Sequence, residues 1–140
     1  MAEKAMLTLI GRQRDESGEE SVTESRAAAD YYQKGDSSYI LYEEALDDFG
    51  DVVNNTIKCN GSMLEMTKRG KIRSRMLFEA GQTHRTDYVK PYGTLPLEVS
   101  TRKFTLSRQE NGIEIRLAYT LASGGRLLSD CTLDISLRFL

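Results

Sequence analysis

Residues 84–99 read HRTDYVKPYGTLPLEV, and this stretch contains both prolines of the 140-residue chain, Pro91 and Pro96. Proline has no backbone N–H, so it cannot donate a hydrogen bond within a β-ladder. We therefore expect a strand over residues 82–89 to end at Pro91, and the next strand to start at Pro96, where a missing donor costs little. Tyr92 is then predicted to lie in the turn, at the rim of the sheet.

Turn-forming residues divide the rest of the chain in the same way. The runs between the turns are short and rich in strand-forming residues, which is typical of an antiparallel meander closed as a barrel or folded as a sandwich. We predict an all-β fold with one domain over residues 1–140, in which nine turns separate ten strands. The turn signals are DESG (15–18), KGDS (34–37), DDFGD (47–51), NG (60–61), RG (69–70), AG (80–81), YG (92–93), NG (111–112) and SGG (123–125).

One segment, SVTESRAAADYY (21–32), is compatible with two structures. Ser21 and Glu24 have the spacing of a helix capping box, and three alanines follow them. Val22 and the two tyrosines favour a strand instead. We favour the strand and keep the helix as the alternative.

Hairpin geometry predicts which side chains point inward. A three-residue loop at 68–70 places apolar residues on one face and charged residues on the other, because side chains alternate along a strand. It pairs Thr67 with Lys71 and Glu65 with Arg73. The inward set then comprises Leu64, Met66, Ile72, Met76 and Phe78.

The same loop at 79–81 pairs Met76 with His84 and points His84, Thr86 and Tyr88 inward. A two-residue turn at Asn111-Gly112 places Phe104 opposite Tyr119.

Two further features concern the C-terminal strands. Leu97 and Val99 have the opposite parity from Phe104 and Leu106, so we expect a β-bulge near residues 100–102. The last strand alternates cleanly and is predicted to bury Leu127, Ser129, Cys131, Leu133, Ile135, Leu137 and Phe139.

The composition is that of an ordinary globular protein, with 39% hydrophobic and 29% charged residues and a formal net charge of −2. This charge provides no general attraction to nucleic acid or to an anionic membrane. No apolar run has the length of a membrane span, and the start MAEKAMLTLIGRQRDE has too short an apolar stretch for a signal peptide. We expect a cytoplasmic protein in which Cys59 and Cys131 are buried, reduced thiols.

Several strings in the sequence resemble one known family. They are YILYEE (39–44), TIK (56–58), LEMTKRG (64–70), LFEAG (77–81), YVKPYGTLPLEVST (88–101) and AYTL (118–121). Together they resemble the YwiB-like family of uncharacterised bacterial proteins, although this chain has Lys90 where a threonine is more usual. The resemblance implies a lipocalin-like (calycin-type) β-barrel of about 8–10 strands and no established activity.

The inward polar residues suggest a ligand site. His84, Thr86 and Tyr88 would lie among Phe104, Tyr119 and other apolar side chains, with Tyr42 and Tyr92 nearby, and a concave apolar pocket with a few polar groups is the usual small-molecule site. We therefore predict a non-enzymatic barrel that binds a small apolar or amphipathic ligand and has no cofactor or metal. The alternative is a filled core in which these groups hydrogen-bond one another.

A second hypothesis concerns the basic run KRGKIRSR (68–75). Lys71, Arg73, Arg75 and Arg85 would form an outer positive surface that binds a protein or RNA partner. The face lacks aromatic residues for base stacking, which disfavours nucleic acid, and Glu65 and Asp87 would offset Arg73. A solvated basic hairpin is the simpler interpretation, and the oligomeric state is not predicted.

Overall fold

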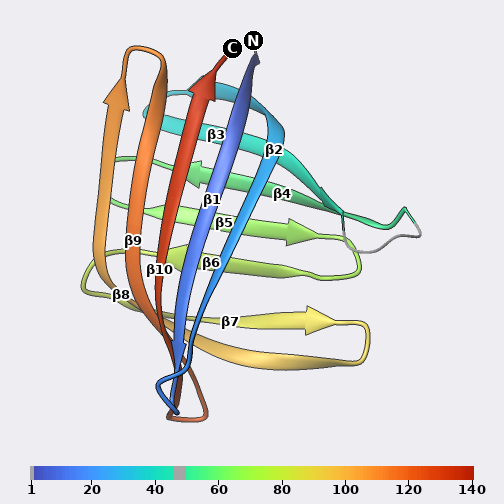
Figure 1. The fold of residues 1–140 in the computed structure, drawn as a ribbon, viewed down its shortest axis with the longest axis vertical. Helices are drawn as coiled ribbons and strands as arrows, with labels where there is room; N and C mark the ends of the chain where they lie inside the picture. The colour runs from blue at the N-terminus through green and yellow to red at the C-terminus, as the bar shows by residue number, and fades with distance from the viewer. Residues whose placement is uncertain (1, 46–49) are drawn as a thin grey trace.

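The computed structural model describes residues 2–45 and 50–140, which form a single antiparallel sheet of ten strands (Figure 1). The strand order is β6-β5-β4-β3-β2-β1-β10-β9-β8-β7, so paired strands are consecutive in sequence except β1 and β10, and β6 and β7 are the two edge strands. This topology confirms the all-β meander. The strands are β1 (Glu3–Asp15), β2 (Glu20–Lys34), β3 (Ser37–Ala45), β4 (Val52–Cys59), β5 (Leu64–Arg69), β6 (Ser74–Phe78), β7 (Thr83–Lys90), β8 (Gly93–Gln109), β9 (Gly112–Ser123) and β10 (Arg126–Phe139).

The segment 21–32 belongs to β2, so the strand prediction is confirmed and the helical alternative is wrong. No helix occurs anywhere in the described ranges. The predicted turn at 47–51 lies mostly outside them.

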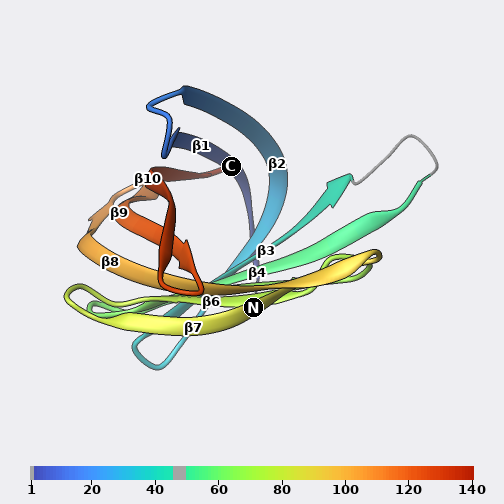
Figure 2. The same ribbon diagram turned by 90° about the horizontal axis from the view of Figure 1, so that it is seen from below.

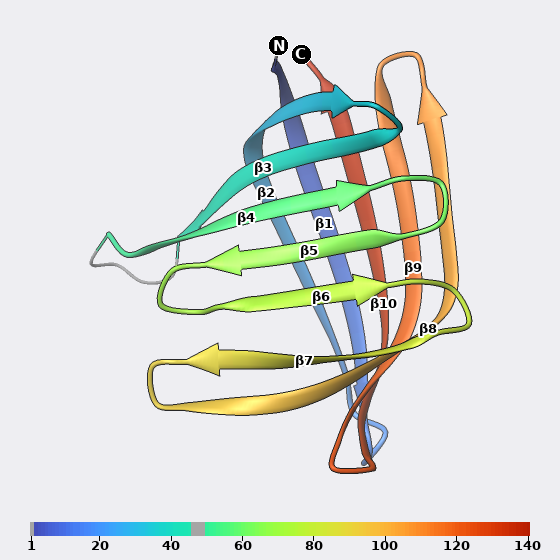
Figure 3. The same ribbon diagram turned by 180° about the vertical axis from the view of Figure 1, so that it is seen from behind.

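The sheet folds into two crossed layers (Figures 1 and 3). β1, β9 and β10 run along the long axis, whereas β3–β7 cross them, behind in Figure 1 and in front in Figure 3, and β2 and β8 bend so that each takes part in both layers. Long strands that bend at corners are the usual way to join crossed sheets. The core lies between the layers, and its largest fully buried side chains include Leu7, Ile40, Ile57, Phe78 and Ile135.

The barrel is nearly closed where its two edge strands meet. β6 and β7 share no ladder, but Arg73, just before β6, bridges to Val89 of β7. The Arg73 N–H donates to the Val89 carbonyl oxygen at 2.9 Å, and the Val89 N–H donates back at 2.8 Å. This isolated bridge is the backbone link between the two edges of the sheet in the described ranges.

The predicted bulge in β8 is confirmed. The register between β8 and β9 shifts between Thr101 and Lys103, which leaves Arg102 as the extra residue. Val99 and Thr101 are buried before the shift, and Phe104 packs against the core after it. The bulge thus lets one strand bury residues of both parities.

Three predicted hairpin registers are wrong by an even number of positions, so the predicted inner and outer faces survive. The five residues 69–73 separate Lys68 from its partner Ser74, so Thr67 faces Arg75 rather than Lys71, and Ile72 lies in the loop. This loop is larger than predicted because its residues bind elsewhere: Arg73 bridges to Val89, and Lys71 Nζ lies 2.6 Å from Asp51 Oδ2. The Arg73–Val89 bridge also replaces the pairing of Met76 with His84 that was predicted across the 79–81 loop.

At the next hairpin, the turn residues are Glu110 and Asn111 rather than Asn111 and Gly112. Phe104 therefore faces Leu117 rather than Tyr119. Gly112 lies within the ladder because it sits directly against the backbone of β10, an approach that turn propensity does not reveal.

The proline corner is close to the prediction. β7 ends at Lys90, and Pro91 and Tyr92 form a two-residue turn. Pro96 lies within β8 rather than at its start, but β8 pairs there with β7 alone because pairing with β9 begins at Glu98. One side of the strand needs no donor at this position, so proline is tolerated.

Only one residue of the last strand contradicts the predicted alternation. Leu127 is 51% exposed, because a second register shift separates it from Ser129. From Ser129 onward the predicted inner residues are buried or half-buried.

Candidate functional site

The barrel wall splits between β2 and β3. Their ladder ends at the pair Ala29–Tyr42. Beyond this pair, residues 20–28 of β2 bond to β1 alone and residues 43–45 of β3 bond to β4 alone. Figure 2 shows β2 curving away from β3 and β4. The split follows from the crossed layers, because β2 must leave β3 to join β1 along the long axis.

A cavity of about 350 Å³ lies at this split. This volume falls at the lower end of the range for small-molecule sites. Its apolar lining comes from Leu7 and Leu9 of β1, Ala27 of β2 and Met66 of β5. Its polar lining includes Tyr42, Glu44 and Lys68. The cavity is therefore amphipathic.

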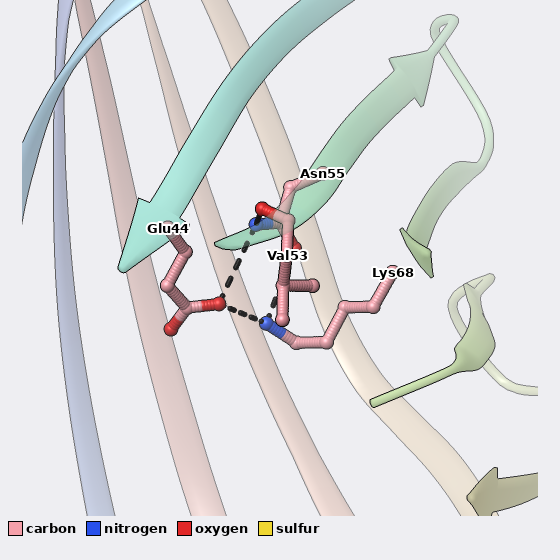
Figure 4. Close-up of polar contacts among 4 residues, drawn as sticks. All are labelled: Glu44, Val53, Asn55 and Lys68. Carbon is pink, nitrogen blue, oxygen red and sulfur yellow. Dashed lines mark hydrogen bonds and ion pairs between the residues drawn. The ribbon is translucent and has the colours of Figure 1, made fainter. Parts of the chain in front are cut away.

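Glu44 and Lys68, which line the cavity, form a polar cluster with Asn55 (Figure 4). The Lys68 ammonium donates to Glu44 Oε1 at 2.8 Å and to Asn55 Oδ1 at 3.2 Å. The Asn55 amide donates to Glu44 Oε1 at 3.4 Å and to the Val53 carbonyl oxygen at 3.3 Å. Asn55 is only 4% exposed, so its polar atoms need these protein partners.

Strand alternation explains why these three side chains meet. Glu44 follows buried Tyr42 on β3 by two positions, and Lys68 follows Met66 on β5 in the same way. Asn55 lies between Val53 and Ile57, which are buried on β4. Residues two apart share a face of a strand, so all three point to the inner side.

Tyr42 adds a hydroxyl to the cavity. Burial raises the pKa of this phenol well above its usual value, and the Glu44 charge raises it further. The hydroxyl therefore stays protonated at neutral pH. It has no hydrogen-bond partner among the residues that the structure describes, so it is available to a polar ligand atom.

The other predicted ligand residues are spread over the barrel. His84, Thr86 and Tyr88 are half-buried, whereas the two residues between them, Arg85 and Asp87, are exposed, which agrees with the predicted inward direction. Burial raises the pKa of Tyr88, although the nearby Lys90 charge opposes this effect. His84 Nε2 lies 3.2 Å from Glu79 Oε1, so the ring already has a polar partner within the protein.

The remaining aromatic residues are not brought into the same hollow. Phe104 and Tyr119 pack against the core, and Tyr119 meets Phe78 edge-on with ring centroids 4.8 Å apart. Tyr92 is 85% exposed at its turn, with Lys90 Nζ 5.8 Å from the ring centroid. Of the seven predicted ligand residues, only Tyr42 lines the 350 Å³ cavity.

Sequence reasoning missed Glu44, Asn55 and Lys68. One signal was present, because the inward parity of Tyr42 and Met66 extends to Glu44 and Lys68. A charged residue at an inward strand position is uncommon and requires a partner. The partners come from different strands, so the sequence alone did not connect them.

The predicted basic surface carries less free charge than expected. Arg75 Nη2 donates to Glu65 Oε2 at 3.0 Å, so Glu65 offsets Arg75 rather than the predicted Arg73. Lys71 pairs with Asp51, whereas Arg85 lies exposed on β7. Two of the four predicted cations therefore have carboxylate partners.

Other possible sites receive little support. Cys59 and Cys131 are buried and free, as expected, and burial raises the pKa of both thiols. Within residues 2–45 and 50–140, no three His, Cys, Asp or Glu side chains are grouped to hold a metal ion. The same ranges contain no helix with the length and apolar character of a membrane span.

Fold and site together define a small all-β barrel with an amphipathic hollow at one corner. The sequence matches the family model described as Domain of unknown function (DUF1934) over residues 7–135, so the chain belongs to this family. The structure is similar to the crystal structure of the ywiB protein from Bacillus subtilis, with a TM-score of 0.87 and 22% identity. The alignment covers 99% of this chain and 93% of that one, which confirms the predicted resemblance and the fold. A comparison with curated proteins gave no match.

Proposed function

We propose that this protein is a non-enzymatic, cytoplasmic binding protein whose lipocalin-like barrel holds one small amphipathic ligand. The observation that carries the proposal is the 350 Å³ cavity at the β2–β3 split. Its apolar lining suits a hydrocarbon or aromatic group, and the Tyr42 hydroxyl and the Lys68–Glu44 pair suit a polar group.

The polar groups of the site support binding rather than a reaction. The ammonium, the carboxylate and the amide already bind one another, and the Tyr42 phenol has a raised pKa. These groups are arranged to donate and accept hydrogen bonds. None is held as a free nucleophile or base.

We favour the ligand site over the basic surface as the functional site. An interaction module that acts through Lys71, Arg73, Arg75 and Arg85 stays a second proposal, since two of its cations are paired. Replacing Arg75 and Arg85 with glutamate separates the two proposals. Binding of a protein or RNA partner depends on these arginines, and ligand binding in the cavity does not.

Titration with N-phenyl-1-naphthylamine, a neutral apolar fluorophore, tests the proposal. We expect its fluorescence to rise on saturable binding to the wild-type protein. The Ala27→Phe variant fills the cavity and should abolish the rise. Ala118→Phe is the matched control, because Ala118 lies outside the cavity on β9. Thermal unfolding of both variants verifies that they fold.

If Ala27→Phe folds and binds the fluorophore as wild type does, the site is not at the β2–β3 split.

A further inference from the structure

A second hollow lies on the outer side of the same split. It is an open groove of about 860 Å³. The groove and the interior cavity share five lining residues: Arg26, Ala27, Tyr42, Glu43 and Ala45. Because these residues border the split on both β2 and β3, the groove and the cavity meet there. A ligand longer than the cavity would extend into the groove.

The charges of the groove favour an anion. Three cations, Lys4, Arg26 and Arg69, and two carboxylates, Asp30 and Glu43, line it. Their sum is one positive charge.

The ion pairs within the protein leave the guanidinium groups of Arg26 and Arg69 most available to a ligand. Lys4 Nζ lies 2.6 Å from Asp30 Oδ1 and is thereby satisfied. Arg26 Nε is 3.9 Å from Glu24 Oε1, and both side chains are mostly exposed, so this contact is weak. Arg69 makes no ion pair with any residue in the described ranges. Arg26 and Arg69 therefore flank the outer side of the split without a strong ion pair, and Glu43 is the remaining carboxylate of the groove.

The inner side of the split has the opposite character. Leu7, Leu9 and Met66 are apolar, and the Lys68 charge is balanced by Glu44. A hydrocarbon chain fits there better than a charged head group, because burying an unpaired charge is costly.

We propose that the ligand is a monoanionic amphiphile with a carboxylate head. Its hydrocarbon part occupies the interior cavity, and its carboxylate lies in the outer groove between Arg26 and Arg69. Guanidinium groups bind carboxylates with charge-assisted hydrogen bonds, often two at once. This inference rests on the proposed function and adds the chemical class and the orientation of the ligand.

Competition against bound N-phenyl-1-naphthylamine tests the inference. The competitors are laurate, dodecanol and dodecylammonium, which share one chain length and differ in head-group charge. At low ionic strength we expect laurate to compete about tenfold more strongly than dodecanol, as two partly exposed ion pairs would provide. Dodecylammonium should compete least, and added salt should weaken the preference for laurate.

Two double variants complete the design. Arg26→Gln with Arg69→Gln should remove the preference for laurate, measured as the ratio of the laurate and dodecanol affinities in the same protein. Arg14→Gln with Arg126→Gln, at the distal hairpins, changes the net charge equally and should retain the preference.

The outcomes separate the two proposals. If the fluorophore binds and is lost in Ala27→Phe, but the three competitors act equally, the carboxylate inference is wrong and the proposed function stands. If the preference for laurate survives loss of Arg26 and Arg69, the head group does not lie in the groove. If neither the fluorophore nor any amphiphile binds, both proposals are overturned.

Discussion

Gly112 should tolerate no larger residue, although it lies in a strand and has no special backbone conformation. A Cβ atom at this position would overlap the Leu137 carbonyl oxygen and would lie 3.2 Å from its carbonyl carbon and 3.4 Å from Arg138 Cα. All three atoms belong to the backbone of β10, which cannot rotate away as a side chain could. Gly112→Ala must therefore separate β9 from β10 at one end of their ladder.

The expected cost follows from the need to move backbone rather than a rotamer. Overpacking in a tight site costs about 3 kcal/mol. For a domain of this length, that loss lowers Tm by about 10 °C.

Gly11 provides a matched control, because its added Cβ would meet only the Leu133 Cδ1 atom at 3.9 Å, an ordinary contact. Gly11→Ala should leave stability unchanged or raise it by about 0.5 kcal/mol, since alanine restricts the unfolded chain. Urea unfolding of the wild type, Gly112→Ala and Gly11→Ala measures the differences in the free energy of unfolding. Equal stabilities for the two variants would refute the close approach of β9 to β10.

Three further predictions concern other contacts. Lys68→Met removes the ammonium partner of Glu44 at the cavity and should lower the free energy of unfolding by about 1 kcal/mol in chemical denaturation. The hydrogen bond from Arg75 lowers the pKa of Glu65 in the folded protein; the resulting stability is present above the unfolded pKa and is lost as pH falls through the folded value. Arg75→Gln should therefore flatten the stability–pH curve in the acidic range, and an unchanged curve would contradict the pairing. Deleting Arg102 removes the bulge and should abolish cooperative thermal unfolding, whereas Arg102→Ala, which loses only an exposed ion pair, should remain within about 1 kcal/mol of wild type.

Much of the fold was predictable because local rules agree along this chain. Turn residues mark ten strands, and side-chain alternation identifies the inner face of each strand. The bulge near Arg102 was predictable for the same reason, since both parities along β8 are apolar and both must be buried. Turn lengths were less predictable, because the loop at 69–73 depends on its contacts with β7 and with Asp51.

Most residues of the candidate site could not be predicted from turn propensity and strand alternation. Tyr42 was identified from its chemistry, but Glu44, Asn55 and Lys68 meet across three strands. Alternation tells which way a side chain points, whereas the position of a hollow depends on where neighbouring strands separate. Here the separation arises because β2 turns from one crossed layer to the other.

The amino-acid sequence was thus sufficient for the strand count, the inner faces and the family, because these depend on turn propensity and on alternation within single segments. The split between β2 and β3, the pairing of Lys68 with Glu44 and the contact of Gly112 with β10 depended on the folded structure. Each of these requires residues far apart in the chain to come within a few ångströms, and only the packing of the two layers sets those distances.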